Sequence, residues 1–304
     1  FGTPVEKRYC GGGILIENAS PTIEGNIITG NKVKHGGGGI FVSSASSPQI
    51  RGNAVTGNEA VGGAGIFVID HSSPEIEGNT ITGNKPHDWG SSPLIAGNNL
   101  TSNEAFIGGG IMVFNNSAPR IEGNTIEKNS APGGGAEGGG GIFVGASSRA
   151  TIEGNTISGN RGGAGGGIFM ELESILTIEG NEFVGNVASF SGGAIDVTSG
   201  CLATIRDNVI VDNEAPYGGG ISVFGSRPAT IKGNVFAGNS ATHGGGIRVK
   251  DRSSAIVIEN EFRDNSAQEG GAVWVAADSR LTRHDPDDNH YAGNQPDDLY
   301  SQPE

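Results

Sequence analysis

A pair of asparagines, five residues apart, recurs along the whole chain. The eleven pairs begin at Asn26, Asn53, Asn79, Asn98, Asn124, Asn155, Asn181, Asn208, Asn234, Asn260 and Asn289. Successive pairs are 26 to 31 residues apart, with a single shorter step of 19 residues. A fixed period of this length indicates a solenoid, in which each repeat forms one coil that stacks on its neighbours.

Each repeat carries three short apolar segments separated by Gly, Ser, Pro and Asn. In the repeat that covers residues 138–160, the first is Ile142-Phe143-Val144 after a run of glycines, the second ends near Ile152, and the third contains Ile157. Segments this short, with alternating inward and outward residues, are typical of β-strands, and the residues between them are typical of turns. Three strands per coil predict an all-β, right-handed parallel β-helix of about eleven coils.

The paired asparagines have a structural explanation in this fold. Stacked coils place equivalent residues about 4.8 Å apart, so buried Asn side chains can form a hydrogen-bonded ladder that also satisfies backbone groups in the turns. We expect one domain over residues 1–304, with 1–13 as an entry segment or partial N-terminal cap and 278–304 as an acidic last coil and tail. In the shortest coil, residues 85–93 lack the Ile-x-Val strand, which predicts a break in the strand stack beneath Trp89.

The chain is acidic, with a formal net charge of −14 and an isoelectric point near 4.8. No basic stripe offsets this charge, so nucleic acid is not expected as a partner. We expect no transmembrane segment, because no apolar run approaches the length of a spanning helix. Cys10 and Cys201 lie about seven coils apart in the predicted solenoid, too far to bond within one molecule. Free thiols and an intermolecular disulfide both remain open for them.

The motifs Ile-x-Val, Ser-Ser-x-Pro, Ile-Glu-Gly-Asn and Ile-x-x-Asn follow one another in the coils, and their order resembles the β-helix repeats of the pectin-lyase-like superfamily. Gly-Gly-Ala-Ile at 192–195 and Phe183-x-x-Asn186 are also similar to repeats of polymorphic outer-membrane autotransporter passengers. The resemblance covers nearly the whole chain and implies the fold. It leaves the function open, because the superfamily includes lyases, glycosidases, epimerases and adhesins. It also implies that a polysaccharide would lie across the outer face of the Ile-x-Val strands.

The middle residue of each Ile-x-Val strand is expected to point outward. In the first half of the chain these residues are mostly phenylalanines, from Phe41 to Phe169, which either stack under turns or form a docking stripe. In the second half they are Asp196, Ser222, Arg248 and Trp274. This half is therefore the better candidate for a site.

Two sets of residues are predicted on this outer face. The expected ligand-binding residues are Phe169, Glu171, Lys250 and Trp274, and the catalytic candidates are Asp196, Tyr217, His243 and Arg248. Arg248 can neutralise a uronate carboxylate, and Tyr217 or His243 can act as acid or base. Asp196 and Glu171 come from adjacent coils and can pair as in a glycosidase. The alternative is a solvated stripe of alternating charges without a catalytic role.

A second row of carboxylates precedes the Gly-Asn steps. Glu122, Glu153 and Glu179 would stack directly, so calcium can bridge them, or water and salt can screen them. No cofactor is required by the rest of the sequence.

The regular, short-turned rod predicts a structural or adhesive role at a cell surface or outside the cell, with a polysaccharide or surface glycan as the partner. Self-association through the solenoid ends or the phenylalanine stripe is a further expectation. The alternative function is a polysaccharide lyase, epimerase or glycosidase that acts on an acidic glycan along the outer face of the Ile-x-Val strands.

Overall fold

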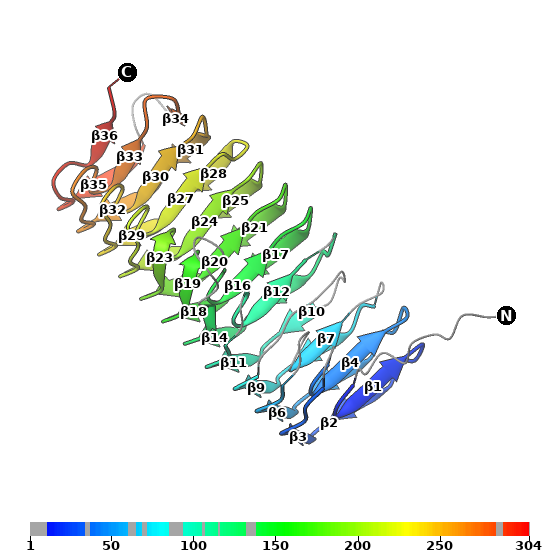
Figure 1. Cartoon of the computed structure of the whole chain (residues 1–304). Helices are drawn as coiled ribbons and strands as arrows, with labels where there is room; N and C mark the ends of the chain where they lie inside the picture. Colours follow the sequence, from blue (N-terminus) through cyan, green and yellow to red (C-terminus); the bar gives the residue numbers. More distant parts are fainter. Residues whose placement is uncertain are drawn as a thin grey trace.

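The protein is an elongated rod of stacked coils built from short strands and turns (Figure 1). The computed structural model describes residues 11–33, 37–59, 65–68, 72–84, 94–104, 107–114, 116–131, 138–283 and 288–303. Strands of successive coils pair in parallel, and the resulting sheets run along the rod. The first and last strands lie at opposite ends of the rod (Figure 1). The predicted all-β parallel solenoid is confirmed.

Two of the sheets run through the described part of the chain without interruption. The first carries the Ile that precedes the first Asn of each pair and consists of β2 (Thr22–Glu24), β5 (Gln49–Arg51), β8 (Glu75–Glu77), β10 (Leu94–Ala96), β13 (Arg120–Glu122), β17 (Arg149–Glu153), β21 (Ile175–Glu179), β25 (Leu202–Arg206), β28 (Ala229–Lys232), β31 (Ser254–Ile258) and β34 (Arg280–Thr282). The second lies between the two asparagines and consists of β3 (Ile27–Thr29), β6 (Ala54–Thr56), β9 (Thr80–Thr82), β11 (Asn99–Thr101), β14 (Thr125–Glu127), β18 (Thr156–Ser158), β22 (Glu182–Val184), β26 (Val209–Val211), β29 (Val235–Ala237), β32 (Glu261–Arg263) and β35 (His290–Ala292).

The third sheet contains the Ile-x-Val strands and is divided into two parts. The first part consists of β1 (Ile14–Glu17), β4 (Ile40–Ser43) and β7 (Ile66–Val68). The second part consists of β12 (Ile111–Val113), β16 (Ile142–Val144), β20 (Ile168–Met170), β24 (Ile195–Thr198), β27 (Ile221–Phe224), β30 (Ile247–Lys250), β33 (Val273–Val275) and β36 (Leu299–Ser301). The division falls at the short coil, where the sequence predicts a break. Residues 85–93 with Trp89, and Cys10 near the N-terminus, lie outside the described residues.

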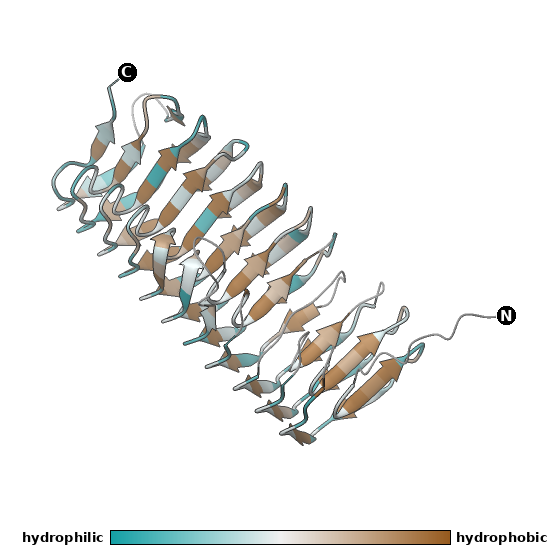
Figure 2. Ribbon diagram, in the orientation of Figure 1, coloured by the Kyte–Doolittle hydropathy of each residue, from teal (hydrophilic) through white to brown (hydrophobic). Residues whose placement is uncertain are grey.

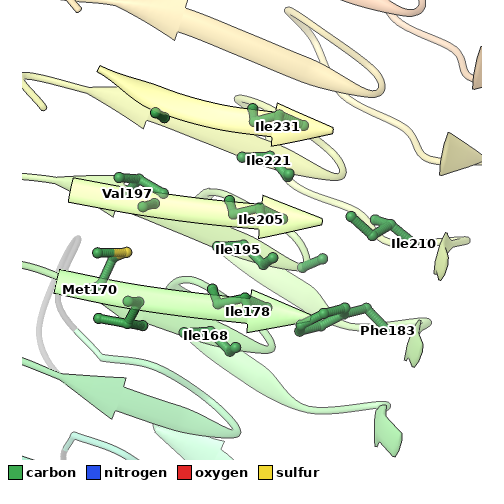
Figure 3. Packing of buried hydrophobic residues seen from close by; sticks show 14 of the residues in the cluster. Ile168, Met170, Ile178, Phe183, Ile195, Val197, Ile205, Ile210, Ile221 and Ile231 are labelled. Carbon is green, nitrogen blue, oxygen red and sulfur yellow. The ribbon is translucent and has the colours of Figure 1, made fainter. Parts of the chain in front are cut away.

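The interior of the rod is a continuous stack of aliphatic side chains from all three sheets. In one coil, Ile142, Ile152 and Ile157 point inward from three different strands and are fully buried. Figure 3 shows the same arrangement in the following coils, where Ile168 and Ile178 lie beneath Ile195 and Ile205. Equivalent side chains therefore meet along the axis at the strand spacing, which packs the core closely.

The asparagines form two ladders that run along the rod, as predicted. The backbone N–H and the Nδ2 of Asn124 both donate to Oδ1 of Asn155 at 2.9 Å, and Asn155 donates in the same way to Asn181. Nδ2 of Asn155 also donates to the strand carbonyl of Ile121 at 2.9 Å. In both ladders the donor belongs to the earlier coil and the acceptor to the following coil. At the end of the second ladder, Asn294 donates from Nδ2 to Asp298 Oδ1 at 2.9 Å.

A fourth row of strands covers part of the outer face of the third sheet, and the sequence analysis did not predict it. β15 (Ser130–Ala131), β19 (Arg161–Ala164) and β23 (Val187–Ser191) form a small sheet, which single parallel bridges such as Tyr217–His243 continue along the rod. Ala164 packs on Phe143 and Phe169, and Ser191 hydrogen-bonds to Asp196. Side chains of the row therefore contact the outward residues of the Ile-x-Val strands.

The glycine runs allow this row to pack closely against the coils. A Cβ placed on Gly219 would lie 2.5 Å from the carbonyl oxygen of Ser240, which belongs to the fourth row of the next coil. The preceding Gly218 has a φ of 65°, a conformation that most side chains disfavour. Glycine at these positions therefore serves the turn and the close backbone approach rather than a phosphate.

Candidate functional site

In the first half of the rod, the outward positions of the third sheet form a buried apolar stack. The ring centroids of Phe143 and Phe169 are 5.7 Å apart, and those of Phe41 and Phe67 are 5.3 Å apart. All four side chains are buried, and Ala164 of the fourth row packs on the later pair. The prediction that Phe169 belongs to an exposed ligand face is therefore wrong, because this ring lies in a small second core outside the coil.

In the second half, the same positions are polar. Asp196, Ser222, Arg248 and Trp274 lie in register on β24, β27, β30 and β33. Figure 2 shows the change, since the third sheet is brown along β1, β4 and β7 but carries hydrophilic positions on β24 and β30. The exposed fraction of Arg248 is only 5 % and that of Trp274 is 4 %, so the prediction that they project into solvent is wrong. Lys250, two residues after Arg248, is exposed as predicted.

Side chains of the fourth row explain this burial. Tyr217 and His243 immediately precede glycine runs, and their backbones form a parallel bridge. Their rings stack with a centroid distance of 5.8 Å and an interplanar angle of 2°. The guanidinium carbon of Arg248 lies 4.3 Å from the centroid of the Tyr217 ring. The buried polar residues thus lie beside a row of rings rather than at a bare surface.

The rings form a continuous feature that we call the aromatic ridge, and it consists of Phe190, Tyr217, His243, Trp274 and Tyr300. Neighbouring centroids along it are 5.6, 5.8, 5.2 and 6.4 Å apart. Phe190, Tyr217 and His243 belong to the fourth row. Trp274 and Tyr300 belong to β33 and β36 of the third sheet, so the ridge crosses from one row to the other between His243 and Trp274. Phe190 is 47 % exposed, and Tyr217, His243 and Tyr300 are half-buried.

Glu269 lies beside two members of the aromatic ridge. Nε1 of Trp274 donates to Oε2 of Glu269 at 3.0 Å, and Nδ1 of His243 lies 3.1 Å from the same oxygen. The guanidinium carbon of Arg248 lies 5.8 Å from the Trp274 ring. Arg248 is therefore stacked between Tyr217 and Trp274, and Glu269 fixes the orientation of Trp274.

Arg248 has unusual surroundings for a buried cation. Burial lowers its pKa, whereas the charge of Asp196 and the Tyr217 hydroxyl raise it. The Nε atom is buried without a hydrogen-bond partner, and in the described part of the chain no carboxylate forms a salt bridge with the guanidinium. A guanidinium that stacks on rings still has N–H donors in its own plane. These donors remain available for an acceptor.

Asp196 is the buried acid of the site, with an exposed fraction of 3 %. Ser191 of the fourth row donates a hydrogen bond to its Oδ2. Burial raises the pKa of Asp196 to about 6, against the lowering effects of the Ser191 and Ser222 hydroxyls and of Arg248. The Oγ of Ser222 and the Oδ1 of Asp196 are both buried and form no hydrogen bond of ordinary geometry, so the Ser222 hydroxyl acts on the carboxyl as a nearby dipole.

The structure brings together Tyr217, His243, Arg248 and Trp274, and places Asp196 two coils before Arg248 in the same row. Glu171 lies in the turn after β20. Its glycosidase-like pairing with Asp196 stays a prediction.

Glu171 acts on Cys201, which is a free, buried thiol. Burial, with a smaller contribution from the Glu171 carboxylate, raises the pKa of Cys201 to about 12. A thiol with so little thiolate is a poor nucleophile at neutral pH. Cys201 is therefore a core residue rather than a reactive one.

The stacked glutamates of the first sheet contact arginines. Arg120 bridges two of them, with Nε 3.0 Å from Glu122 and Nη2 3.2 Å from Glu153. Arg206 Nη2 lies 2.5 Å from Glu179. Among the residues that the structure describes, no group of three or more His, Cys, Asp or Glu side chains is arranged to hold a metal ion. Arg120 and Arg206 thus compensate part of the charge of the stacked glutamates.

Sequence reasoning missed Ser191, Phe190 and Glu269, which complete the site from the fourth row. The available signal was their place just before the glycine runs, the position that Tyr217 and His243 share in other coils. This signal required knowing that the segment folds back over the strand that follows it.

The described strands and turns include no helix with the length and apolarity that crossing a membrane would require. No curated protein and no solved structure matches the chain. A family model described as a right-handed beta helix region matches residues 6–191 and 140–295. These overlapping matches extend over most of the sequence, and they agree with the parallel sheets described above. The chain belongs to the right-handed β-helix family.

Proposed function

We propose that the protein is a rigid structural or adhesive rod at a cell surface or outside the cell, and that it binds a linear carbohydrate along the aromatic ridge. The observation that carries this proposal is the continuity of the ridge, with ring centroids 5.2 to 6.4 Å apart over several coils. Its accessible members are Phe190, Tyr217, His243 and Tyr300. A linear polymer of repeating units is the kind of ligand that can contact such rings on several coils.

The chemistry of the ridge supports a carbohydrate in particular. A sugar has apolar C–H surfaces and hydroxyl groups, so it needs apolar ring surface next to hydrogen-bonding groups. The Phe190 side chain is nearly half exposed, and its ring plane is inclined by 78° to that of Tyr217. The Tyr217 hydroxyl, the His243 imidazole and the half-exposed Glu269 supply polar groups on successive coils.

Rigidity of the rod supports a structural role. Each coil is fixed to the next by strand pairing and by two asparagine ladders, and the core extends through the coils without a gap in the second half. Because neither ladder requires a ligand, the ridge is held in place before any partner arrives, which reduces the entropy lost on binding.

Binding to a panel of neutral and acidic polysaccharides tests the proposal. Tyr217→Ala should weaken binding at least about tenfold, since stacking and a hydroxyl are lost from the centre of the ridge. Val209→Ala is a matched control, because Val209 is exposed on β26 in the second sheet, away from the ridge. Equal binding by wild type and Tyr217→Ala would show that the ridge is not the glycan face.

A second candidate function, a polysaccharide lyase, epimerase or glycosidase, is favoured by one specific observation. Burial raises the pKa of Asp196 to about 6, and the charge of Arg248 acts on it from the same row, which is the kind of environment found in acid–base catalysis. The same polysaccharide panel discriminates the two functions. Release of reducing ends or unsaturated products that Asp196→Asn abolishes would identify an enzyme, whereas binding without turnover supports the rod.

A further inference from the structure

We propose that Arg248 forms a subsite for the carboxylate of an acidic sugar, and that Asp196 controls the occupancy of this subsite through its own charge. The inference rests on the proposed function, since it concerns the same face, and it names the ligand class and the regulation. Its basis is a row of three buried polar groups, Asp196, Ser222 and Arg248, each of which has an unpartnered atom.

The unpartnered guanidinium is the first step of the argument. The exposed fraction of Arg248 is 5 %, yet its Nε has no hydrogen bond. The carboxylate of the row, Asp196, is two coils away. A buried cation is stable only when its charge is paired and its donors are satisfied. The solenoid itself does not need this cation, because phenylalanine occupies the same position in earlier coils. The unsatisfied donors therefore point to an external acceptor.

The surrounding rings define which acceptor fits. Tyr217 lies 4.3 Å and Trp274 5.8 Å from the guanidinium carbon, so ring surfaces flank the guanidinium and its open donors lie in its own plane. A planar carboxylate matches this fork with two parallel hydrogen bonds. The neighbouring ridge can contact the rest of the sugar. An acidic monosaccharide unit thus combines both requirements.

Asp196 is the competing anion of the row. When it is ionised, its negative charge compensates Arg248 and repels an incoming carboxylate. When it is protonated, Arg248 is the dominant charge of the row. Two unit charges separated by two coils, about 10 Å, interact strongly enough at an effective dielectric constant of about 20 to change an affinity about tenfold.

Other charged groups face this pair as well. The hydroxyls of Ser191 and Ser222 face Asp196. The rings of Tyr217 and Trp274 flank Arg248. His243 and Glu269 contact each other beside these rings, and Lys250 is exposed on the strand that carries Arg248. Among the groups that face it, Asp196 is the acid for which burial raises the pKa, to about 6. Carboxylate binding should therefore strengthen as the pH falls from about 8 to about 5, where a sugar carboxylate is still ionised.

Calorimetric titration with sodium glucuronate at about pH 8 and about pH 5, at constant ionic strength, tests the inference. We expect wild type to bind about tenfold more tightly at the lower pH. Glucose, a neutral control, should bind much more weakly at both pH values. Glucuronate affinity that is equal at the two pH values would overturn the control by Asp196.

Three variants assign the effect to residues. Asp196→Asn should bind glucuronate with high affinity at both pH values, because the competing charge is gone. Arg248→Lys keeps the positive charge but loses the planar fork, and it should lose most of the affinity. Arg252→Gln is the matched control, since it removes an exposed cation four residues away and should retain the pH difference. Binding by Arg248→Lys at the wild-type level would refute the subsite.

The outcomes also separate this inference from the proposed function. If Tyr217→Ala abolishes binding of neutral glycans but glucuronate binding does not depend on Arg248, the ridge binds sugar and the subsite fails. If glucuronate binding depends on Arg248 while neutral glycans bind equally well without Tyr217, the subsite stands and the ridge proposal fails. Thermal unfolding of each variant verifies that it is folded, and Asp196→Asn alone still tests the inference if Arg248→Lys does not fold.

Discussion

The two halves of the rod place different chemistry on the same backbone position. Phe143 and Phe169 occupy the outward position of β16 and β20, and Asp196 and Arg248 occupy it in β24 and β30. The strands pair residue for residue across the change, so the backbone does not respond to it. In both halves these side chains are buried.

This difference shows that the outer position has no fixed requirement in the solenoid. Apolar rings there form a second core that stabilises the first half. The polar residues of the second half lose hydration on burial and have unpartnered atoms, so they contribute less to stability than rings would. Their presence is better explained by a function than by the fold.

The largest effect is expected in the apolar half. Phe143→Ala should lower the free energy of unfolding by about 3–5 kcal/mol, because it removes a buried ring and leaves a cavity between Phe114 and Phe169. Chemical denaturation measures the change. A loss below about 1 kcal/mol would mean that the outer stack is loosely packed and would weaken the contrast between the halves.

A pH-dependent effect is expected in the polar half. The folded pKa of Asp196, about 6, is above its ordinary value of 3.8, so the folded state retains this proton to a higher pH than the unfolded chain. Its contribution to stability is present below pH 3.8 and is lost as the pH rises towards 6. Asp196→Asn imitates the protonated acid and should be more stable than wild type at about pH 8, by at most about 3 kcal/mol, with little difference near pH 4.

Urea denaturation of both proteins across this pH range measures the effect. The stability of wild type should vary more steeply with pH than that of Asp196→Asn. If the two profiles run parallel, the carboxyl of Asp196 does not titrate in this range and the polar half lacks the desolvation cost that we assign to it.

The asparagine ladders should contribute equally to the stability of the two halves of the rod. Asn155→Ala and Asn234→Ala each remove side-chain hydrogen bonds to both neighbouring coils, and each should lower the free energy of unfolding by about 1–3 kcal/mol. Denaturation midpoints of the two variants should agree closely. Clearly unequal losses would show that the halves differ in the interior as well as on the outer face.

The smallest effect is expected for Ser222→Ala. The Ser222 hydroxyl is fully buried and has no hydrogen-bond partner, so its removal should change the free energy of unfolding by less than about 1 kcal/mol in either direction. Thermal unfolding at about pH 7 checks this. A large loss would indicate that a bound water or ligand satisfies the hydroxyl in solution.

Much of the fold could be predicted from the sequence because the repeated residues lie in the interior of the coils. The paired asparagines and the Ile-x-Val segments occupy positions where every coil has the same neighbours above and below, so their spacing specifies the strands, the ladders and the division at the short coil. The resemblance to autotransporter passengers stays a prediction, since the family match concerns the β-helix alone.

The burial of the site could not be predicted in the same way. Tyr217 and His243 were placed on the correct edge of the strand, but the segment that carries them was interpreted as a turn and not as a row that packs over Arg248. Its course depends on contacts between coils, such as the bridge from Tyr217 to His243 and the hydrogen bond from Ser191 to Asp196. A periodic pattern in one coil does not reveal such contacts, so Arg248 and Trp274 were expected in solvent.

The uniform direction of the asparagine ladders gives the rod an electrical polarity. In each Asn–Asn contact the earlier amide donates through Nδ2 and the following amide accepts through Oδ1, so the amide dipoles add head to tail, as peptide dipoles do in a helix. The partial positive ends of both rows point toward the last coils. Asp298, which accepts from Asn294, places a carboxylate at the positive end of one row, just as an anion is favoured at the positive N-terminal end of a helix. The two ends of the rod therefore present opposite fields to anything that approaches them.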